Sequence, residues 1–491
     1  MSIYIGGGLG EPILRGTRSK VIIVTLVLLA TFFGGGLYVD LQSRQPAPLG
    51  VDTASNKLQP IIDAHPWMGV GLSQLNLTTE AVPIIVVSTY GSKSDGSLSI
   101  QAGDGLNAMT DIVQDEVNAY CQKIGSKYRF DFVPFPILGT VEGVNASIQA
   151  FNDLSVKMVV QDYWTVMWKD DLKTIRDNDM LYVIGRDTSR ITDKLDGIYG
   201  IRPEINKGDY YYAVATAKGV KALVVLQRDF SPLPTESRQS MQQQTDQSMR
   251  DFEALGGVVV KKIIYPPPEE VDFYMDIEHN ANFSQYLNEA EAAVKSAIAT
   301  YGEDKVGVLV IGAEMSPLIY QSREMPSLMS VPWFGSDLNS GIGVIGGSPA
   351  SEQVGPYAEK VGFYMPVESV ENKVALEKLS GELAAKMGMQ SYPFSPQETS
   401  RYDGCWLLAL SVIKADSTDP KKVEAALPQA AAEYNGLNGN YALNEKGNKI
   451  SYNVDIYKVY ETDPGKYAHL KCGSYNSLTG VIFEDTKQPL P

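Results

Sequence analysis

The chain has 491 residues, more than one compact hydrophobic core usually accommodates, which predicts two lobes or domains. Hydrophobic residues make up 44% of it and charged residues 20%, the proportions of an ordinary globular protein, which argues against a largely disordered chain. The formal net charge of −16 argues against nucleic acid as a partner, because a nucleic-acid-binding surface needs a cluster of basic residues. We attribute most of the acidic side chains to the solvated surface.

Near its start the sequence carries an apolar segment, Val21 to Val39, without a single charged residue. At about 1.5 Å rise per residue, a helix of this length just crosses a hydrocarbon core of roughly 30 Å. Arg15, Arg18 and Lys20 precede the segment, and basic residues beside a membrane helix stay on the cytoplasmic side. We therefore expect a cytoplasmic tail over 1–20, a single transmembrane anchor over 21–39 and the bulk of the chain outside the cell.

A cleavable secretory signal is the alternative for the same segment, with Val21 to Phe33 as its apolar part and Gly34 to Gly36 as its small residues. The absence of an A-x-A site and the long basic region before the segment favour the anchor, and both alternatives export the protein. Residues 40–80 are rich in proline and glycine, which predicts a stalk or linker. Three N-glycosylation sequons agree with export, at Asn76, Asn145 and Asn282.

Three cysteines cannot form a disulfide framework, and at least one of them must stay unpaired. Cys121 and Cys405 lie in apolar helical patterns, which is typical of small core residues. The sequence leaves a bridge between Cys405 and Cys472 open.

From Val82 onward the sequence alternates between short apolar runs and amphipathic helical patterns. This alternation predicts βαβ units, and hence parallel sheets with helices on both faces. The expected strands are Val82–Ser88, Arg129–Val133, Lys157–Gln161, Leu181–Ile184, Ala222–Gln227, Val258–Tyr265, Val306–Ile311 and Tyr452–Tyr460.

Ligands of open parallel sheets bind at the carboxyl ends of the strands, so the loops that follow Gln161, Ile184, Gln227 and Ile311 are the expected functional positions. The three histidines are too few and too scattered for a zinc site or a catalytic triad. We therefore expect neither an enzyme nor a cofactor.

Seven short motifs follow one another in an order that resembles a known family. They are Phe252–Tyr265 (FEALGGVVVKKIIY), Ala281–Leu287 (ANFSQYL), Val308–Glu324 (VLVIGAEMSPLIYQSRE), Val331–Asp337 (VPWFGSD), Val361–Pro366 (VGFYMP), Tyr402–Gly404 (YDG, expected to open a helix) and Gly436–Asn448 (GLNGNYALNEKGN). In this order they resemble the type I periplasmic binding proteins, above all the leucine/isoleucine/valine-binding-protein-like substrate-binding proteins of ABC transporters. The resemblance covers about 82–460.

The resemblance implies an α/β fold of two Rossmann-like lobes, joined by three crossovers, that close on a ligand between them. Mapped onto this sequence, it places residues 81–203 and 338–430 in lobe 1 and residues 204–337 and 431–460 in lobe 2. Residues 461–491 would then form a C-terminal extension.

The resemblance also implies ligand-binding residues. The family's Gly-Pro-Tyr-Ser-Ser loop corresponds to Gln161–Thr165 (QDYWT), which keeps a hydroxyl at Thr165 but loses the glycine, the proline and a serine. Its Ser-Pro-x-Ala-Thr loop corresponds to Val183–Asp187, which puts the ligand-binding threonine at Asp187 or at Thr188 beside it. Its ammonium-binding glutamate corresponds to Glu314.

The chemistry of these residues predicts a ligand with a positive group. A carboxylate desolvated at a cleft needs a partner, and a ligand cation would supply one to Glu314. Tyr163 and Trp164 offer aromatic faces to a cation or an apolar tail. Arg186 and Arg228 lie in the same loops, where they either bind a carboxylate or pair with the acids.

We therefore expect an extracytoplasmic solute-binding protein of an ABC-type importer, held to the cell membrane by its single anchor. Its ligand would be a cationic or zwitterionic solute (an amino acid, a peptide or an amine), and its partners would be separate permease and ATPase subunits. Two alternatives stay open: a ligand-sensing receptor subunit, and a structural cell-envelope protein that has kept the fold and lost the pocket.

Overall fold

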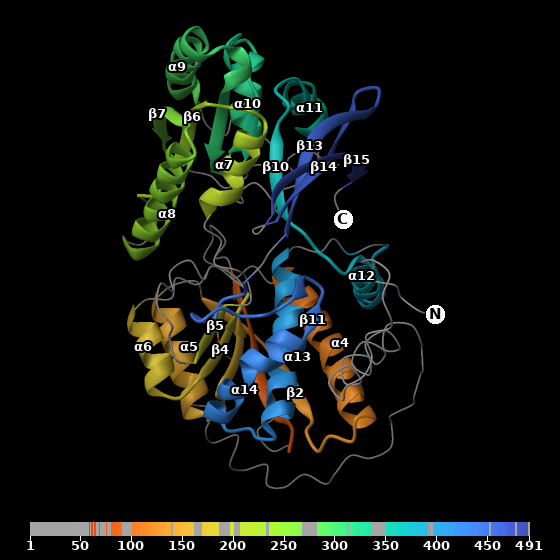
Figure 1. Ribbon diagram of the computed structural model, residues 1–491. Helices are drawn as coiled ribbons and strands as arrows, with labels where there is room; N and C mark the ends of the chain where they lie inside the picture. The colour runs from red at the N-terminus through yellow and green to blue at the C-terminus, as the bar shows by residue number, and fades with distance from the viewer. Residues whose placement is uncertain are drawn as a thin grey trace, which may run out of the picture.

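The computed structural model describes residues 80–90, 101–138, 141–161, 169–185, 197–200, 207–231, 235–267, 282–312, 314–335, 350–390, 392, 396–450, 453–476 and 479–489, with scattered positions between 58 and 75. Two sheets organise these residues into two lobes, which Figure 1 shows one above the other.

Lobe 1 contains a five-stranded parallel sheet in the order β2-β1-β3-β4-β5. Its strands are β1 (Val82–Tyr90), β2 (Phe130–Leu138), β3 (Met158–Gln161), β4 (Leu181–Ile184) and β5 (Ile198–Gly200). Its helices are α4 (Gln101–Lys123), α5 (Val141–Asp153), α6 (Lys169–Asp177), α12 (Lys373–Met387), α13 (Pro396–Ala415) and α14 (Pro420–Glu433). Successive β1 residues are buried in different apolar clusters, Val86 with α4 and α13 and Val87 with α5, so helices cover both faces as predicted.

Lobe 2 contains an eight-stranded mixed sheet in the order β15-β14-β13-β10-β9-β8-β6-β7. Its strands are β6 (Ala222–Arg228), β7 (Val258–Tyr265), β8 (Val306–Ile311), β9 (Trp333–Gly335), β10 (Tyr364–Glu368), β13 (Asn453–Asp463), β14 (Lys466–Asn476) and β15 (Gly480–Pro489). Its helices are α7 (Lys207–Ala217), α8 (Thr235–Ala254), α9 (Ser284–Tyr301), α10 (Met315–Gln321) and α11 (Ala350–Lys360), with short 3-10 turns η2 (Glu303–Lys305) and η3 (Leu328–Ser330). Every residue of β8 is buried, as expected for a central parallel strand covered on both faces.

The chain crosses between the lobes three times, the number that the resemblance implied. It leaves lobe 1 after β5 and enters α7, it returns from β10 to α12, and it leaves again after a short hairpin, β11 (Asn435–Gly436) and β12 (Gly439–Asn440), to reach β13. Helix α12 begins directly after the second crossing, where the Asn372 side chain accepts a hydrogen bond of 3.1 Å from the Ala375 amide.

These crossings orient the two sheets. Strand β10 is parallel to β9, and through β9 to β8, β6 and β7, so all five strands end on the side from which β10 crosses into lobe 1. The parallel strands of lobe 1 likewise end on the side from which β5 crosses into lobe 2. The carboxyl edges of the two parallel sheets therefore face each other, and this is where open parallel sheets bind ligands.

The lobe boundaries differ from the predicted ones in three places. Residues 350–368, expected in lobe 1, form α11 and β10 of lobe 2. Tyr434 and Tyr441, expected in lobe 2, are buried in the core of lobe 1. Residues 461–491 are no separate extension, because β14 and β15 pair with β13 and widen the sheet of lobe 2. Strand pairing decides the first and third of these assignments, and core packing of the two tyrosines decides the second. The local sequence pattern contains neither.

Three further predictions concerned the start of a helix, a cysteine bridge and a membrane-spanning helix. The motif at Tyr402 does not open a helix, since α13 begins at Pro396 and carries the motif in its interior. All three cysteines are buried and none of them forms a disulfide; Cys405 lies in lobe 1 and Cys472 in lobe 2, which excludes the bridge between them. None of the helices in the described part of the chain has the length and apolarity to cross a membrane. The predicted anchor, 21–39, lies outside the described residues.

Candidate functional site

At the carboxyl edge of lobe 2, three neighbouring strands bring together an arginine, a tyrosine and a glutamate. Arg228 ends β6 and lies in register with Tyr265, which ends β7, while Glu314 follows β8 on the other side of β6. The Tyr265 hydroxyl donates a hydrogen bond of 2.8 Å to Oε2 of Glu314. A guanidinium nitrogen of Arg228 lies 3.2 Å from Oε1 of the same carboxylate.

A glycine makes this arrangement possible. A Cβ atom at Gly312 would lie 2.0 Å from the Tyr265 hydroxyl oxygen and 2.7 Å from Oε2 of Glu314. Any larger residue at position 312 would therefore force these two side chains to move.

The three side chains differ sharply in their exposure. The Glu314 side chain is fully buried, whereas 30% of the Arg228 side chain is exposed. Burial raises the pKa of the Tyr265 phenol well above its ordinary value, and the negative charge of Glu314 raises it further, while Arg228 opposes the shift. Tyr265 is therefore a neutral donor, and Arg228 supplies the positive charge that a buried carboxylate needs.

Two glutamines at the facing edges carry buried amide atoms without a hydrogen-bond partner. Gln161 ends β3 in lobe 1 and leaves Nε2 without an acceptor. Gln227 precedes Arg228 and leaves Oε1 without a donor, although its Nε2 lies 3.3 Å from Oε1 of Gln242. Both side chains are almost fully buried. Unsatisfied buried polar groups are rare in proteins and are often found where a ligand binds.

The structure describes one of the six predicted ligand residues. Glu314 lies at the carboxyl edge, as expected, but its carboxylate is paired with Arg228 and bonded to Tyr265. The other five lie outside the described residues: Tyr163, Trp164, Thr165, Asp187 and Thr188. Tyr265, Gln227 and Gln161 were not predicted as site residues; their position at or next to the carboxyl ends of predicted strands was the signal that could have identified them.

The three predicted glycosylation sequons differ in position and exposure. Asn76 lies outside the described residues. Asn145 is half-buried within α5, and the hydroxyl of Ser147 in its sequon is buried and donates 2.7 Å to the Gly143 carbonyl, so this sequon offers little access to a glycosylating enzyme. Asn282 is exposed just before α9.

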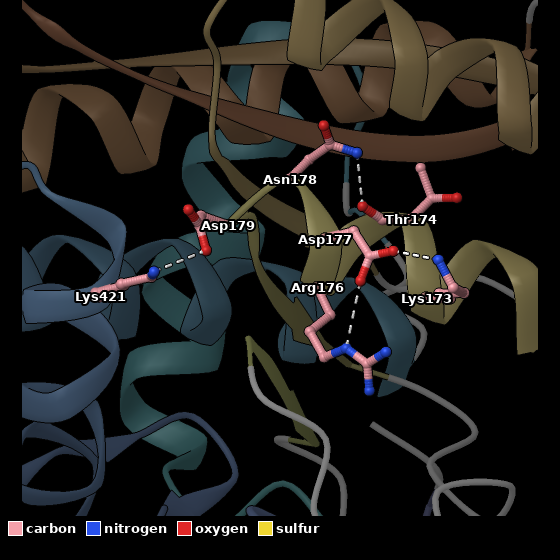
Figure 2. Close-up of polar contacts among 7 residues, drawn as sticks. All are labelled: Lys173, Thr174, Arg176, Asp177, Asn178, Asp179 and Lys421. Carbon is pink, nitrogen blue, oxygen red and sulfur yellow. Dashed lines mark hydrogen bonds and ion pairs between the residues drawn. The ribbon is translucent and has the colours of Figure 1, made fainter.

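A concavity lies at the end of lobe 1 that is opposite to its carboxyl edge. It has a volume of about 520 Å³ and is lined by residues that include Met180, Leu181 and Gly197 at the amino ends of β4 and β5. Figure 2 shows three of its charged lining residues, Arg176, Asp179 and Lys421, and Nζ of Lys421 lies 3.1 Å from a carboxylate oxygen of Asp179. Because the amino ends of these strands point away from lobe 2, this concavity is not the space between the lobes.

The described part of the chain contains no cluster of three or more histidine, cysteine or acidic side chains arranged to hold a metal ion.

Comparison with known proteins supports the architecture. The sequence matches no family model and no curated protein. Among solved structures, an ABC transporter substrate-binding protein from Sphaerobacter thermophilus is 15% identical, with a TM-score of 0.56 over 83% of this chain and 100% of that one. A substrate-binding protein from Desulfitobacterium hafniense in complex with Leu is 14% identical, with a TM-score of 0.54 over 80% of this chain and 100% of that one. A solute-binding protein from R. palustris in complex with benzoate is 14% identical, with a TM-score of 0.53 over 82% of this chain and 98% of that one. The chain therefore has the two-lobed fold of the type I periplasmic, or solute-binding, proteins.

Proposed function

We propose that this chain is an extracytoplasmic solute-binding protein of an ABC-type importer and that it closes on an amino acid, a peptide or an amine between its lobes. The observation that carries this proposal is the pair of facing carboxyl edges, on which Arg228, Glu314 and two unsatisfied glutamines lie. Hinge closure about the three crossovers would bring these edges together around a ligand.

The similar structures support a small ligand and a transport role. All three are substrate-binding or solute-binding proteins of ABC transporters, and two of them hold small molecules with a carboxylate, leucine in one and benzoate in the other. By this likeness the protein binds its solute without transforming it, and separate permease and ATPase subunits carry out the uptake.

On the lobe 1 side we propose that Thr165, Asp187 and Thr188 contact the ligand, with Tyr163 and Trp164 as aromatic walls. These residues follow β3 and β4, whose carboxyl ends face lobe 2. Replacing each by alanine and measuring ligand affinity would test the assignment.

We further propose that 21–39 anchors the protein to the cell membrane as a single helix, that a stalk follows it, and that exported Asn76 and Asn282 accept glycans. The stalk is shorter than the expected 40–80, because Met68 and Leu75 are buried in the core of lobe 1 and Leu58 and Ile61 pack against the same core. The uncharged apolar run and the basic residues before it support the anchor. Alkaline extraction of membranes, with mass spectrometry of the mature N-terminus, tests it. A protein that begins after Gly36 and washes off the membrane would establish the cleaved signal instead.

The decisive experiment for binding is a thermal-shift screen of the full-length chain, solubilised in detergent, against amino acids, short peptides and amines. A ligand present at a hundred times its dissociation constant stabilises a protein by about 2.7 kcal/mol, which such a screen detects. A flat screen would contradict the binding function and favour the structural envelope protein. A ligand that binds without supporting uptake in cells with the permease genes would favour the sensor.

A further inference from the structure

Two buried side-chain amides at the carboxyl edge of lobe 1 have atoms without a hydrogen-bond partner. Gln161 ends β3, is 2% exposed and leaves its Nε2 donor without an acceptor. Asn448, on the third crossover, is 1% exposed and leaves both its Nδ2 donor and its Oδ1 acceptor without a partner. Because burial also keeps bulk water away, these two residues are exceptions to the rule that buried polar groups are hydrogen-bonded.

Strand register places the two residues in one row across the sheet. Gln161 is in register with Ile184 of β4, Ile184 is in register with Gly200 of β5, and Gly200 forms a parallel bridge with Asn448. Residues that lie side by side on neighbouring strands point to the same face of a sheet, so Gln161 and Asn448 share a face. It is the face that α5 covers, because Ile184 is buried in one apolar cluster with residues of α5.

The backbone around Asn448 is held firmly by hydrogen bonds. Its amide donates to Oδ1 of Asn444 at 3.0 Å, and its carbonyl accepts from the Asn444 amide at 2.7 Å. Beside it, the Gly200 amide donates to the Gly447 carbonyl and the Lys449 amide donates to the Gly200 carbonyl, both at 2.9 Å. An unsatisfied side chain at so well-fixed a position indicates a partner that comes from outside the chain.

The spacing of the row selects the length of that partner. Three strand spacings of about 4.8 Å separate the backbone of Gln161 from that of Asn448, roughly 14 Å in all. An extended peptide covers about 3.5 Å per residue, so about four residues span the row. A single amino acid or a small amine reaches only one of the two amides.

A peptide backbone also carries the groups that these amides need. One of its carbonyl oxygens would accept from Nε2 of Gln161, and the N–H and C=O of one residue would pair with Oδ1 and Nδ2 of Asn448. An ammonium group supplies donors only and a carboxylate acceptors only, so neither satisfies both atoms of Asn448. Gly200, between the two amides, has no side chain to keep a ligand backbone away from the row.

We propose that the ligand is an extended peptide of about four residues, whose backbone lies along this row and bonds to Gln161 and Asn448. This inference rests on the proposed solute-binding function and narrows it: of the three ligand classes, peptides are preferred over single amino acids and amines. Asn448 lies on a crossover, so the hinge motion of the lobes opens the row to the peptide and closes it again.

Pools of peptides of increasing length test the inference on the full-length chain in detergent. Random pools of single amino acids, dipeptides, tripeptides, tetrapeptides and pentapeptides, and a mixture of amines, are each equilibrated with the protein. Ultrafiltration with mass spectrometry then identifies the retained molecules. We expect retention to rise steeply up to about four residues and to change little beyond that length.

An ester scan of a retained tetrapeptide tests the role of its backbone. Each backbone N–H is replaced in turn by an ester oxygen, and calorimetry measures the affinity of each analogue. We expect the affinity to fall more than about tenfold at the position that faces Asn448, because the ester leaves Oδ1 of Asn448 buried without a donor. Equal affinities for the peptide and all its esters would contradict this pairing.

Two variants of similar side-chain volume separate a ligand-binding role from a structural one. Gln161→Met and Asn448→Leu remove the unsatisfied amide atoms. The melting temperature of the ligand-free protein should therefore stay unchanged or rise, while the affinity for the tetrapeptide should fall more than about tenfold. Gln122→Met is the control, because this exposed glutamine lies in the last turn of α4, which leads to the amino end of β2.

The results that would overturn the inference differ from those that would overturn the function. Retention of single amino acids or amines without any gain from longer peptides would overturn this inference and leave the solute-binding function standing. The same holds if the two variants melt earlier and keep their affinity, which would assign the amides to buried water. Pools from which no amino acid, peptide or amine is retained would overturn both.

Discussion

The buried carboxylate of Asp403 provides the sharpest test of how lobe 1 is held together. Asp403 lies within α13 and is fully buried. Its Oδ1 accepts hydrogen bonds from the Tyr434 hydroxyl at 2.8 Å and the Leu437 amide at 2.9 Å. Its Oδ2 accepts from the Asn438 amide at 3.1 Å and from the Tyr441 hydroxyl. This one side chain thus ties α13 to the β11–β12 hairpin that precedes the third crossover.

Replacing Asp403 by asparagine keeps the shape of the side chain but turns one of its two hydrogen-bond acceptors into a donor. One acceptor oxygen becomes an NH₂ group, so the two donors that faced it lose their acceptor and meet another donor instead. At about 1 to 3 kcal/mol for each buried donor without a partner, Asp403→Asn should lower the free energy of unfolding of lobe 1 by about 2 to 6 kcal/mol. Tyr441→Phe removes a single bond to the charged carboxylate and should cost about 1.5 to 3 kcal/mol.

Urea unfolding followed by circular dichroism measures the overall loss, and hydrogen exchange with mass spectrometry locates it. We expect faster exchange in the 396–440 segment and unchanged exchange in β6 and β8 of lobe 2. Asp416→Asn is the control, because that aspartate is exposed and has only surface contacts at stake, an ion pair with Lys127 at 2.7 Å and a hydrogen bond from the Tyr128 hydroxyl at 3.2 Å. If Asp403→Asn unfolds within about 0.5 kcal/mol of the wild type, within the usual range for surface substitutions, and the Leu437 and Asn438 amides stay protected, the carboxylate does not hold the hairpin.

Three further predictions concern other parts of the chain. Gly197→Ala should destabilise lobe 1 by about 1 to 3 kcal/mol in thermal unfolding, because Gly197 has a φ of +81° and an added Cβ would lie 2.3 Å from the Met180 carbonyl oxygen. An unchanged melting temperature would contradict this backbone and steric strain. The Ser231 hydroxyl and amide donate hydrogen bonds that hold the pKa of the Asp229 carboxyl below its ordinary value, so Ser231→Ala should raise that pKa in a carboxyl NMR titration. The small stability that this contact contributes should be lost as the pH falls through the folded-state pKa of Asp229. The three cysteines are buried and form no disulfide, so a thiol reagent should label them only after unfolding, and a reductant should leave the melting temperature unchanged; rapid labelling of the native protein would contradict their burial.

Much of the architecture could be predicted from the sequence. Hydrophobic periodicity located seven of the parallel strands, β1 to β4 and β6 to β8, and their ends located the carboxyl edge at which Glu314 lies. It missed the short strand β5. Periodicity is a local property of the backbone, since alternate strand residues and every third or fourth helical residue share a face. Ordered short motifs then predicted the two lobes and their three crossovers.

The tertiary structure decided which strands pair and which charges meet. Strands β10, β14 and β15 joined the sheet of lobe 2 through pairing with distant β9 and β13, which no local pattern records. Glu314, expected to await a ligand cation, is joined instead to Tyr265, 49 residues earlier, and to Arg228 from a third strand. The sequence by itself determined that a carboxylate lies at this edge, because its place depends on one strand and the loop that follows. Only the folded chain determined that its charge is already compensated, because that depends on the order of three strands in the sheet.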